Sequence, residues 1–592
     1  MGSLFQSERS YAKLLLSYLT LFIVFQHLAL CEEASLSLLV QNEYSNYASP
    51  GNDYEWLEEK VLIEPHRETQ LTLVNSDKKR TYRWKIYEDG AQEKLTFEGE
   101  EIFHIFTSLG FYTLEIQEYE GEFVTQKLYF ELAVKYVRRE IRKLSEQDRN
   151  ELLDAMKLMW EIGDEEGRER WGGMYTSLFT LHKYHLIMSG DQACDHIHDG
   201  YGFLSHHSYL NFIFEQSLQS INPKLALPYW DFIYDVEEWN SVENELERWD
   251  FTNSEIFTEG FFGATDPETN FIADGRWANL QIPSFDSQYY KSDDKQVPQN
   301  AYGYLRAPWS NNPDPHLIRN QFVCGELPTN EVDLASRCGS LKVLFQLDNW
   351  ESFGKYISYL PHGRVHVLLG GALNCKDAYD KLEASFPPDD KDTPQKIRSL
   401  SYAIHKNLYR NKYLDCSGVT TAGQKTCSCT NEDEIVQDQT RLDKFLRDAM
   451  PGFGLEAFTF NIKSTLVRTF CNSHLVDGDA LQSSSSYAPE FWLIHSNTDR
   501  MFTFKLRYSS FKIGKWPDIP FFMDYEYEDY CIGHGAEDQV LLGMHPTDIN
   551  GQLHIPSVRE WLEMISPQRD DISYVYDELN WDYCEEFGTK VN

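Results

Sequence analysis

Short runs of alternating apolar and polar residues fill the chain from residue 35 to residue 135. Segments such as "LSLLV", "TQLTLV", "TYRWKIY" and "QKLYFELAV" place an apolar residue at nearly every second position, and turn-forming residues separate them. Successive side chains of a β-strand point to opposite faces, so this period of two is typical of half-buried strands. Several such strands at short intervals predict an antiparallel β-sandwich over residues 35–135.

One strand region of this sandwich, "FTSLGFYTLEI", resembles part of an immunoglobulin-like or PKD-like module. This resemblance implies a domain that supports or spaces its neighbours and carries no chemistry of its own.

The period of the apolar positions changes near residue 136. In "VRREIRKLSEQDRNELLDAMKLMWEI", Ser145 is followed three residues later by Asp148, which resembles the start of a capped helix. Leu152, Met156 and Met159 then share one helix face. We therefore expect a mainly α-helical domain to begin at residue 136 and to run to residue 375. Residues 376–484 are richer in charge and serine, and we interpret them as a cysteine-containing insertion of loops or a small lobe, with residues 485–592 completing the domain.

The first 31 residues have the composition of a secretory signal peptide. Arg9 and Lys13 precede the apolar run "LLLSYLTLFIVFQHLAL", which is too short and too interrupted for a membrane span. We expect cleavage near Cys31, a protein that is secreted or in the lumen of the secretory pathway, and no transmembrane segment in the mature chain. Ten cysteines remain, an even number that favours disulfides. For the "CSC" pair at 427–429, disulfides are favoured over a metal site.

Charge excludes one broad class of partner. The 592 residues carry 93 Asp and Glu against 54 Lys and Arg, a net charge of −39. Nucleic-acid binding depends on cationic contacts with phosphate, so we expect no nucleic-acid partner. A strongly negative surface attracts cations, metal ions among them.

Four of the 18 histidines lie in the twelve residues "HIHDGYGFLSHH", from 196 to 207. His198 and His207 are nine residues apart, so they can reach one metal ion only if the chain bends between them. The turn residues "DGYG" at 199–202 provide that bend. The helical pattern that follows points His207 inward, and we expect His196 and His206 to be solvated or to support a ligand from behind.

Three further segments contain histidines at helical spacing. His362 and His366 are four residues apart in "PHGRVHVLLGG", so both can reach one metal ion from one helix face. "MYTSLFTLHKYHLIMSG" offers His182 and His185 on another amphipathic helix. His495 ends an aromatic run, and Asp499 follows four residues later, where its carboxylate could orient the imidazole.

These segments together resemble the type-3 copper proteins, the family of tyrosinases, catechol oxidases and molluscan haemocyanins. The resemblance rests on "YTSLFTLH", "HDGYGFLSHH", "LPYWDF", "HGRVH" and "APEFWLIHSNTDRMF". It implies a copper domain with a four-helix-bundle core and two copper ions per chain. By position, the first copper would take His182, His198 and His207, and the second His362, His366 and His495.

The chain departs from the family pattern at several points. The separation between His366 and His495 is unusually long, and Ala488 and Ile494 replace an aspartate and a histidine that often precede the last ligand. Some relatives link a cysteine to the second ligand of the first copper by a thioether. In those relatives the cysteine stands two residues before the ligand, whereas Cys194 stands four residues before His198. Cys194 therefore either forms an altered thioether or belongs to a disulfide.

The resemblance implies oxidation of o-diphenols to o-quinones by dioxygen, with a small phenol as the substrate. In the family, an Asn after the first ligand of the second copper helps to hold a water that accepts the phenolic proton; here that residue is Gly363, which implies weak monophenol hydroxylation. Val367 is a candidate for an apolar wall of the access route. A haemocyanin-like oxygen carrier, a binding protein without catalysis, and zinc in place of copper are the alternatives. The aromatic segment "DISYVYDELNWDYC" near the C-terminus could cover the copper site or pack against the core.

Overall fold

The structure is a computed structural model of the chain. It describes residues 36–48, 57, 60–88, 93–241, 250–284, 297–327, 337–416, 427–522, 531–540, 555–567, 569 and 572–591. The expected signal peptide, residues 1–31, lies outside these ranges. Within them, no helix combines the length and the apolar character needed to cross a membrane. The chain divides into two compact units, one ending at Lys135 and the other beginning at Tyr136.

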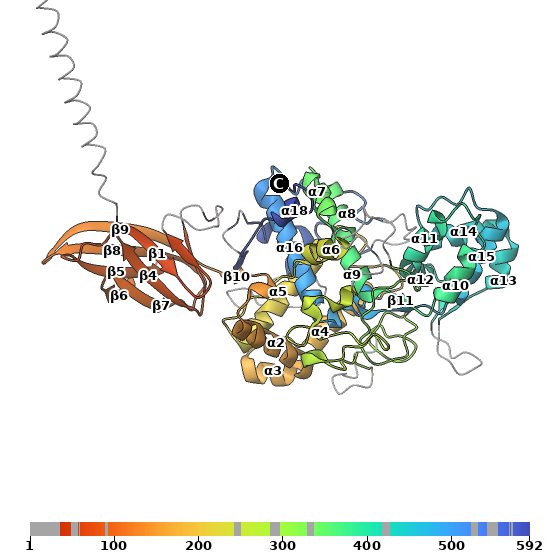
Figure 1. The fold of residues 1–592 in the computed structure, drawn as a ribbon, viewed down its shortest axis with the longest axis horizontal. Coiled ribbons are helices and arrows are strands. Elements are labelled where there is room, and N and C mark those ends of the chain that lie inside the picture. The colour runs from red at the N-terminus through yellow and green to blue at the C-terminus, as the bar shows by residue number, and fades with distance from the viewer. Residues whose placement is uncertain are drawn as a thin grey trace, which may run out of the picture. The chain divides into compact units, whose positions relative to one another are not determined.

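The first unit contains two β-sheets (Figure 1). The four-stranded sheet has the order β2-β1-β4-β7, and the five-stranded sheet has the order β3-β9-β8-β5-β6. The strands are β1 (Ser37–Gln41), β2 (Asn46–Ala48), β3 (Val61–Ile63), β4 (Glu68–Val74), β5 (Thr81–Glu88), β6 (Glu93–Glu98), β7 (Glu101–Ile105), β8 (Gly110–Glu120) and β9 (Phe123–Val134).

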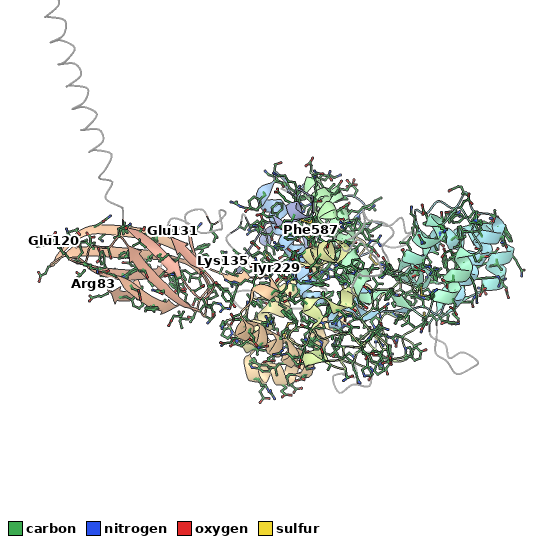
Figure 2. All side chains as sticks on the ribbon, viewed as in Figure 1. Arg83, Glu120, Glu131, Lys135, Tyr229 and Phe587 are labelled. Carbon is green, nitrogen blue, oxygen red and sulfur yellow. A yellow bond between two sulfur atoms is a disulfide. The ribbon has the colours of Figure 1, made fainter. Side chains whose placement is uncertain are left out.

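The alternating residues explain why the two sheets pack together. Leu38 and Leu71 of one sheet and Trp84 and Leu114 of the other are fully buried in one shared core. Charged residues, Glu120 among them, lie at the surface (Figure 2). The predicted sandwich is therefore present, but it is not wholly antiparallel, because β3 runs parallel to β9. Its likeness to an immunoglobulin-like or PKD-like module stays a prediction.

The second unit is mainly helical. Its helices are α2 (Glu146–Glu161), α3 (Asp164–Trp171), α4 (Leu178–Ser189), α5 (Phe203–Ile221), α6 (Phe232–Asn240), α7 (Cys338–Gln346), α8 (Trp350–Tyr359), α9 (His362–Gly370), α10 (Lys376–Glu383), α11 (Asp392–Ser399), α12 (Ser401–Arg410), α13 (Glu432–Gln437), α14 (Gln439–Ala449), α15 (Phe460–Asn472), α16 (Phe491–Tyr508), α17 (Val558–Met564) and α18 (Tyr583–Glu586). Its short strands are β10 (Tyr136–Arg138), β11 (Ala372–Leu373), β12 (Leu414–Asp415), β13 (Ser428–Cys429), β14 (Val476–Asp477) and β15 (Tyr574–Tyr576).

The first of these helices begins where the sequence places its cap. The Ser145 side chain accepts a hydrogen bond from the backbone N–H of Asp148 at 3.1 Å, and the apolar face of α2 is buried. The segment before the cap is not helical, however. Residues 136–138 form β10, which pairs in parallel with β15 far along the chain, so a tertiary strand contact decides their conformation.

Residues 376–484 form a helical lobe and not a set of long loops. The lobe comprises helices α10 to α15, which lie close together in Figure 1. Its core includes Leu408, Leu446 and Leu466, and it also takes in Trp309 and Val367 from outside the lobe. The lobe therefore shares a hydrophobic core with the rest of the second unit.

Five disulfides pair all ten cysteines of the described residues, as the even number predicted. The pairs are Cys194–Cys531, Cys324–Cys375, Cys338–Cys584, Cys416–Cys427 and Cys429–Cys471. The two cysteines of "CSC" go to different partners, so this motif binds no metal.

Candidate metal centre

Six imidazoles form two neighbouring groups in the interior of the second unit. His185, His198 and His207 make the first triad, and each contributes a ring nitrogen within 4.8 Å of the others. The second triad consists of His362, His366 and His495, whose ring nitrogens also lie within 4.8 Å of one another. The triads adjoin each other, since the rings of His207 and His495 stack with their centroids 4.3 Å apart.

Four helices carry five of these six imidazoles. His185 lies on α4, His207 on α5, both His362 and His366 on α9, and His495 on α16. The apolar faces of α5 and α16 pack together, and α16 also contacts α9. Because His362 and His366 are one turn apart, their rings meet on one face of α9, with centroids separated by 4.6 Å.

Backbone carbonyls fix the protonation of four of the rings. The Nδ1 atoms of His185, His207, His362 and His366 lie 2.7–3.1 Å from the carbonyl oxygens of Ser483, Phe203, Ser358 and Ala480. A carbonyl only accepts, so each Nδ1 is the donor and, in a neutral ring, Nε2 keeps its lone pair.

Three of the Nε2 atoms lack hydrogen-bond partners among the described residues, whereas those of His362 and His495 lie 3.4 Å from each other. The three atoms without partners, on His185, His207 and His366, are buried. Three unsatisfied buried nitrogens in one region need an explanation, and unprotonated imidazole nitrogens in groups of three are suitable metal ligands. The donor set therefore fits a bound metal ion in each triad.

Burial keeps these rings neutral. Desolvation is the largest cause that holds the pKa of His185, His207, His362 and His495 well below the usual value. Electrostatic repulsion from the neighbouring imidazoles is the second cause and acts in the same direction. The pKa of His366 falls to about 4, again mainly through burial. A metal ion binds only the unprotonated ring, so no proton has to leave these imidazoles at neutral pH when the metal binds.

A cavity of about 430 Å³ adjoins the triads. Its wall includes His198, His362, His366 and His495, with the rings of Phe203 and Phe491 beside them. Most of its exposed wall is apolar, and the volume falls in the range of small-molecule sites. Gly363 is part of this wall, as the sequence suggested. Val367 is not among the lining residues, because its side chain is buried in the core that the lobe shares with its surroundings.

Comparison with known proteins agrees with this geometry. Residues 173–388 match the family model of the common central domain of tyrosinase. The chain contains a tyrosinase-family domain. The matched span includes five of the six clustered histidines, and His495 follows beyond its end. This domain and its two histidine groups indicate a copper-dependent oxidase.

Other comparisons add little to the tyrosinase assignment. No curated protein matches the chain. The tyrosinase from Burkholderia thailandensis, solved at high pH, is 15% identical to this chain, with a TM-score of 0.28 over 76% of this chain and 75% of the bacterial one. At that TM-score the likeness carries no structural argument.

The structure places His185, and not the predicted His182, in the first triad. The Nε2 of His182 donates to the Leu305 carbonyl at 3.1 Å, and its Nδ1 lies 3.0 Å from the Ser486 hydroxyl. Both ring nitrogens of His182 are thus satisfied within the protein. His182 and His185 are three residues apart on α4 and both fully buried, so helical periodicity could not separate them.

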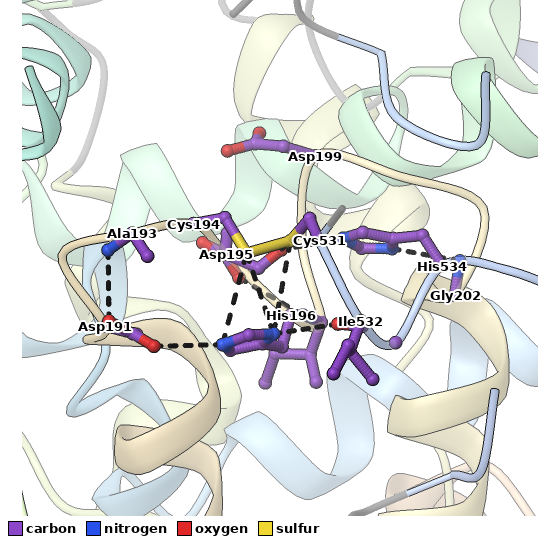
Figure 3. Close-up of a disulfide and its surroundings, with 12 residues drawn as sticks. Asp191, Ala193, Cys194, Asp195, His196, Asp199, Gly202, Cys531, Ile532 and His534 are labelled. Carbon is purple, nitrogen blue, oxygen red and sulfur yellow. Dashed lines mark hydrogen bonds and ion pairs between the residues drawn. A yellow bond between two sulfur atoms is a disulfide. The ribbon is translucent and has the colours of Figure 1, made fainter. Parts of the chain in front are cut away.

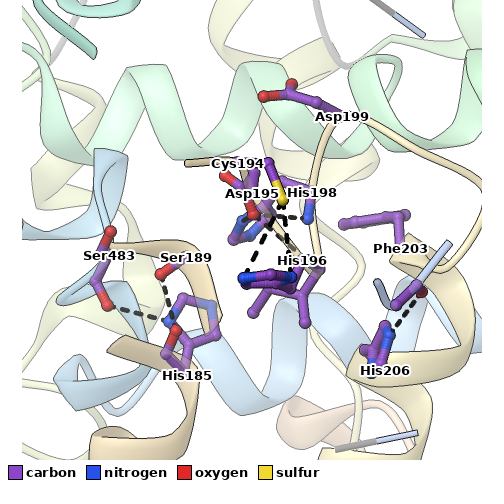
Figure 4. A network of polar contacts seen from close by, with 12 residues as sticks. His185, Ser189, Cys194, Asp195, His196, His198, Asp199, Phe203, His206 and Ser483 are labelled. Carbon is purple, nitrogen blue, oxygen red and sulfur yellow. Dashed lines mark hydrogen bonds and ion pairs between the residues drawn. The ribbon is translucent and has the colours of Figure 1, made fainter. Parts of the chain in front are cut away.

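His198 lies in the loop between α4 and α5, and a carboxylate holds it. One oxygen of Asp195 accepts from the His198 backbone N–H at 2.8 Å and from its Nδ1 at 3.1 Å (Figure 4). Burial raises the pKa of Asp195, but the charges of His198 and Arg410 outweigh this and hold it well below the usual value. Asp195 is not among the residues predicted from the sequence, although its position three residues before His198 is a possible signal.

The two remaining imidazoles of "HIHDGYGFLSHH" hold a distant segment. His196 Nδ1 donates to the Ile532 carbonyl at 2.7 Å, and His206 Nε2 donates to the Gly533 carbonyl at 2.8 Å (Figures 3 and 4). The disulfide Cys194–Cys531 ties the same two segments together, so Cys194 makes no thioether. His206 is fully buried, which excludes the solvated alternative of the two that the sequence left open for it.

Asp499 does not orient His495. Its Oδ2 accepts from the hydroxyls of Tyr574 and Tyr576 at 2.6 and 2.7 Å and from Arg138 at 3.2 Å, and it makes no described hydrogen bond with His495. These two tyrosines belong to the aromatic C-terminal segment. That segment therefore packs against the core, and none of its described residues lines the cavity.

Proposed function

We propose that this chain is a type-3 copper oxidase that uses dioxygen to oxidise o-diphenols to o-quinones. The observation that carries the proposal is the convergence of two groups of three imidazoles beside a largely apolar cavity. The tyrosinase-family match over residues 173–388 supports the choice of copper and of phenolic substrates.

His185, His198 and His207 would hold one copper ion, and His362, His366 and His495 the other. When bound, the copper pair supplies the redox chemistry that removes two electrons from the diphenol and passes electrons to dioxygen. The protein's part is to keep the rings neutral and oriented, through the carbonyls that accept from Nδ1. The rings of Phe203 and Phe491 pack against the imidazoles at centroid distances of 4.3–6.3 Å and limit their rotation.

The cavity wall favours diphenols over monophenols. A monophenol must first give up its phenolic proton to a base, and Gly363 offers no side chain to hold a water for that purpose. A β-carbon placed on Gly363 would meet only the Ser358 carbonyl oxygen, at 3.5 Å, so this part of the wall is open. We therefore infer weak hydroxylation of monophenols at most.

Five disulfides suit an oxidising compartment, and we propose that the protein is secreted or lies in the secretory-pathway lumen. Cleavage near Cys31 is tested by sequencing the N-terminus of the exported protein.

The decisive experiment combines metal analysis with oxidation assays. We expect about two copper ions per purified chain, rapid oxidation of catechol and slow oxidation of tyrosine. Reversible oxygen binding without turnover of catechol would identify an oxygen carrier instead. Zinc in the triads, or no metal in folded protein exposed to copper, would refute the proposed oxidase.

A further inference from the structure

Helix α12 of the inserted lobe reaches the loop that carries His198. The apolar side of α12 is anchored in the lobe core, where Ile404 and Leu408 are buried. Its other side presents Lys406 and Arg410, which are four residues apart and therefore lie on one helix face. Both cations meet carboxylates of the loop between α4 and α5.

The two cations bind the carboxylates on either side of His198 in the sequence. Arg410 Nη2 lies 3.0 Å from Asp195 Oδ2, and Lys406 Nζ lies 2.7 Å from Asp199 Oδ2. The other oxygen of Asp195 is the one that accepts from the backbone and ring of His198. A continuous chain of contacts therefore runs from the lobe to the imidazole, and the side chains of Arg410 and Asp195 are each only 3% exposed.

We propose that Arg410 is a positioning residue for the first triad, acting through Asp195 on His198. This inference rests on the proposed function, because it assigns the lobe a part in copper binding at that site. It makes the lobe a component of the metal centre: Arg410 fixes one oxygen of Asp195, and the other oxygen then sets the rotation of the His198 ring.

The contact has a physical consequence because His198 lacks a helix to support it. Its side chain is 28% exposed, the most of any triad member. Without Arg410, the buried Asp195 carboxylate would lose the cation that binds its Oδ2 and would turn toward other donors. The His198 ring would then sample orientations in which Nε2 points away from the triad, and the first copper would dissociate more easily.

The test compares Arg410→Gln with Arg398→Gln. Arg398 is a matched control: it belongs to the same lobe, its side chain is also 3% exposed, and it pairs with Asp380 and Glu383, neither of which touches a triad histidine. Each variant is loaded with copper, and the release of copper to a chelator is followed by metal analysis. Loss of an outer-shell partner typically weakens metal binding 10–100-fold. We expect one copper to leave R410Q about 10-fold or more faster than wild type, and the other at the wild-type rate.

In the control R398Q, both coppers should leave within about twofold of the wild-type rate. The isosteric variant Asp195→Asn breaks the same chain of contacts without changing side-chain volume, and it should release the same single copper early even if R410Q fails to fold. Wild-type release from a folded R410Q or from D195N would overturn the role of Arg410. Wild-type protein that takes up no copper would instead overturn the proposed function.

Discussion

The choice between His185 and His182 as a copper ligand gives a sharp prediction. We consider the matched variants His185→Asn and His182→Asn, in which the asparagine amide nitrogen can occupy the place of Nδ1 while Nε2 is deleted. In H185N the hydrogen bond to the Ser483 carbonyl can survive, and the deleted atom is one without a protein partner. In H182N the deleted atom is the donor to the Leu305 carbonyl.

The two variants should therefore fail in different measurements. Both lose the same volume, so their cavity costs largely cancel. H182N additionally leaves a buried carbonyl unsatisfied, and we expect its metal-free form to be less stable than metal-free H185N by about 1–3 kcal/mol. If His185 is a direct ligand as proposed, the first copper should bind to H185N at least 10–100-fold more weakly, a loss of about 1.4–2.7 kcal/mol.

Three measurements decide the matter: copper per chain, catechol oxidation, and denaturant unfolding of the metal-free proteins. We expect about one copper and no measurable oxidation in H185N, against two coppers and near-normal oxidation in folded H182N. The reverse result, with copper lost from H182N and retained in H185N, would refute the tautomer argument that assigns Nε2 of His185 to the metal.

Three further predictions follow from the same structure. Gly363→Asn, for which the wall has space, should raise the rate of tyrosine hydroxylation relative to catechol oxidation about tenfold or more; an unchanged ratio would contradict the role of Gly363. Burial, reinforced by Asp479, raises the pKa of Asp477 to about 8, so folded protein holds this proton between about pH 4 and 8 while unfolded protein releases it. The free energy of unfolding should thus fall with rising pH by about 1.4 kcal/mol per pH unit in that window. In Asp477→Asn this contribution is absent, so its melting temperature should fall less than that of the wild type between about pH 5 and pH 7.5. Bound copper should stabilise the folded protein by about 4 kcal/mol when its free concentration is a thousandfold above its Kd. Removing copper with a chelator should therefore lower the melting temperature, and added copper should restore it.

Local features of the chain could be predicted from the sequence. Alternating residues identified the strands from Ser37 to Val134, and Ser145 identified the start of α2, because both signals depend only on neighbouring residues. Five of the six clustered histidines were found in the same way, with the family resemblance specifying how they group. The sequence could not distinguish His182 from His185, because both face the same buried side of α4.

Contacts between distant segments could not be predicted. The interpretation of Asp499 failed because Tyr574 and Tyr576, which arrive from a segment 75 or more residues away, occupy its carboxylate. The part played by α12 was missed for a similar reason: nothing in the sequence of Lys406 and Arg410 shows that this face meets Asp195 and Asp199. Periodicity tells which face of an element is buried, but not which partner buries it.

The density of histidine between residues 196 and 207 can be explained by the one triad histidine that lies outside a helix. A side chain on a helix takes a fixed direction from the backbone, whereas a metal-binding side chain on a loop has to be held by additional contacts. Around His198 these contacts are unusually numerous: Asp195 on its ring, the disulfide Cys194–Cys531 before it, and the bonds of His196 and His206 to residues 532 and 533 on either side. Two of the four imidazoles are therefore suited to binding metal, and the other two fasten the loop so that His198 can do so.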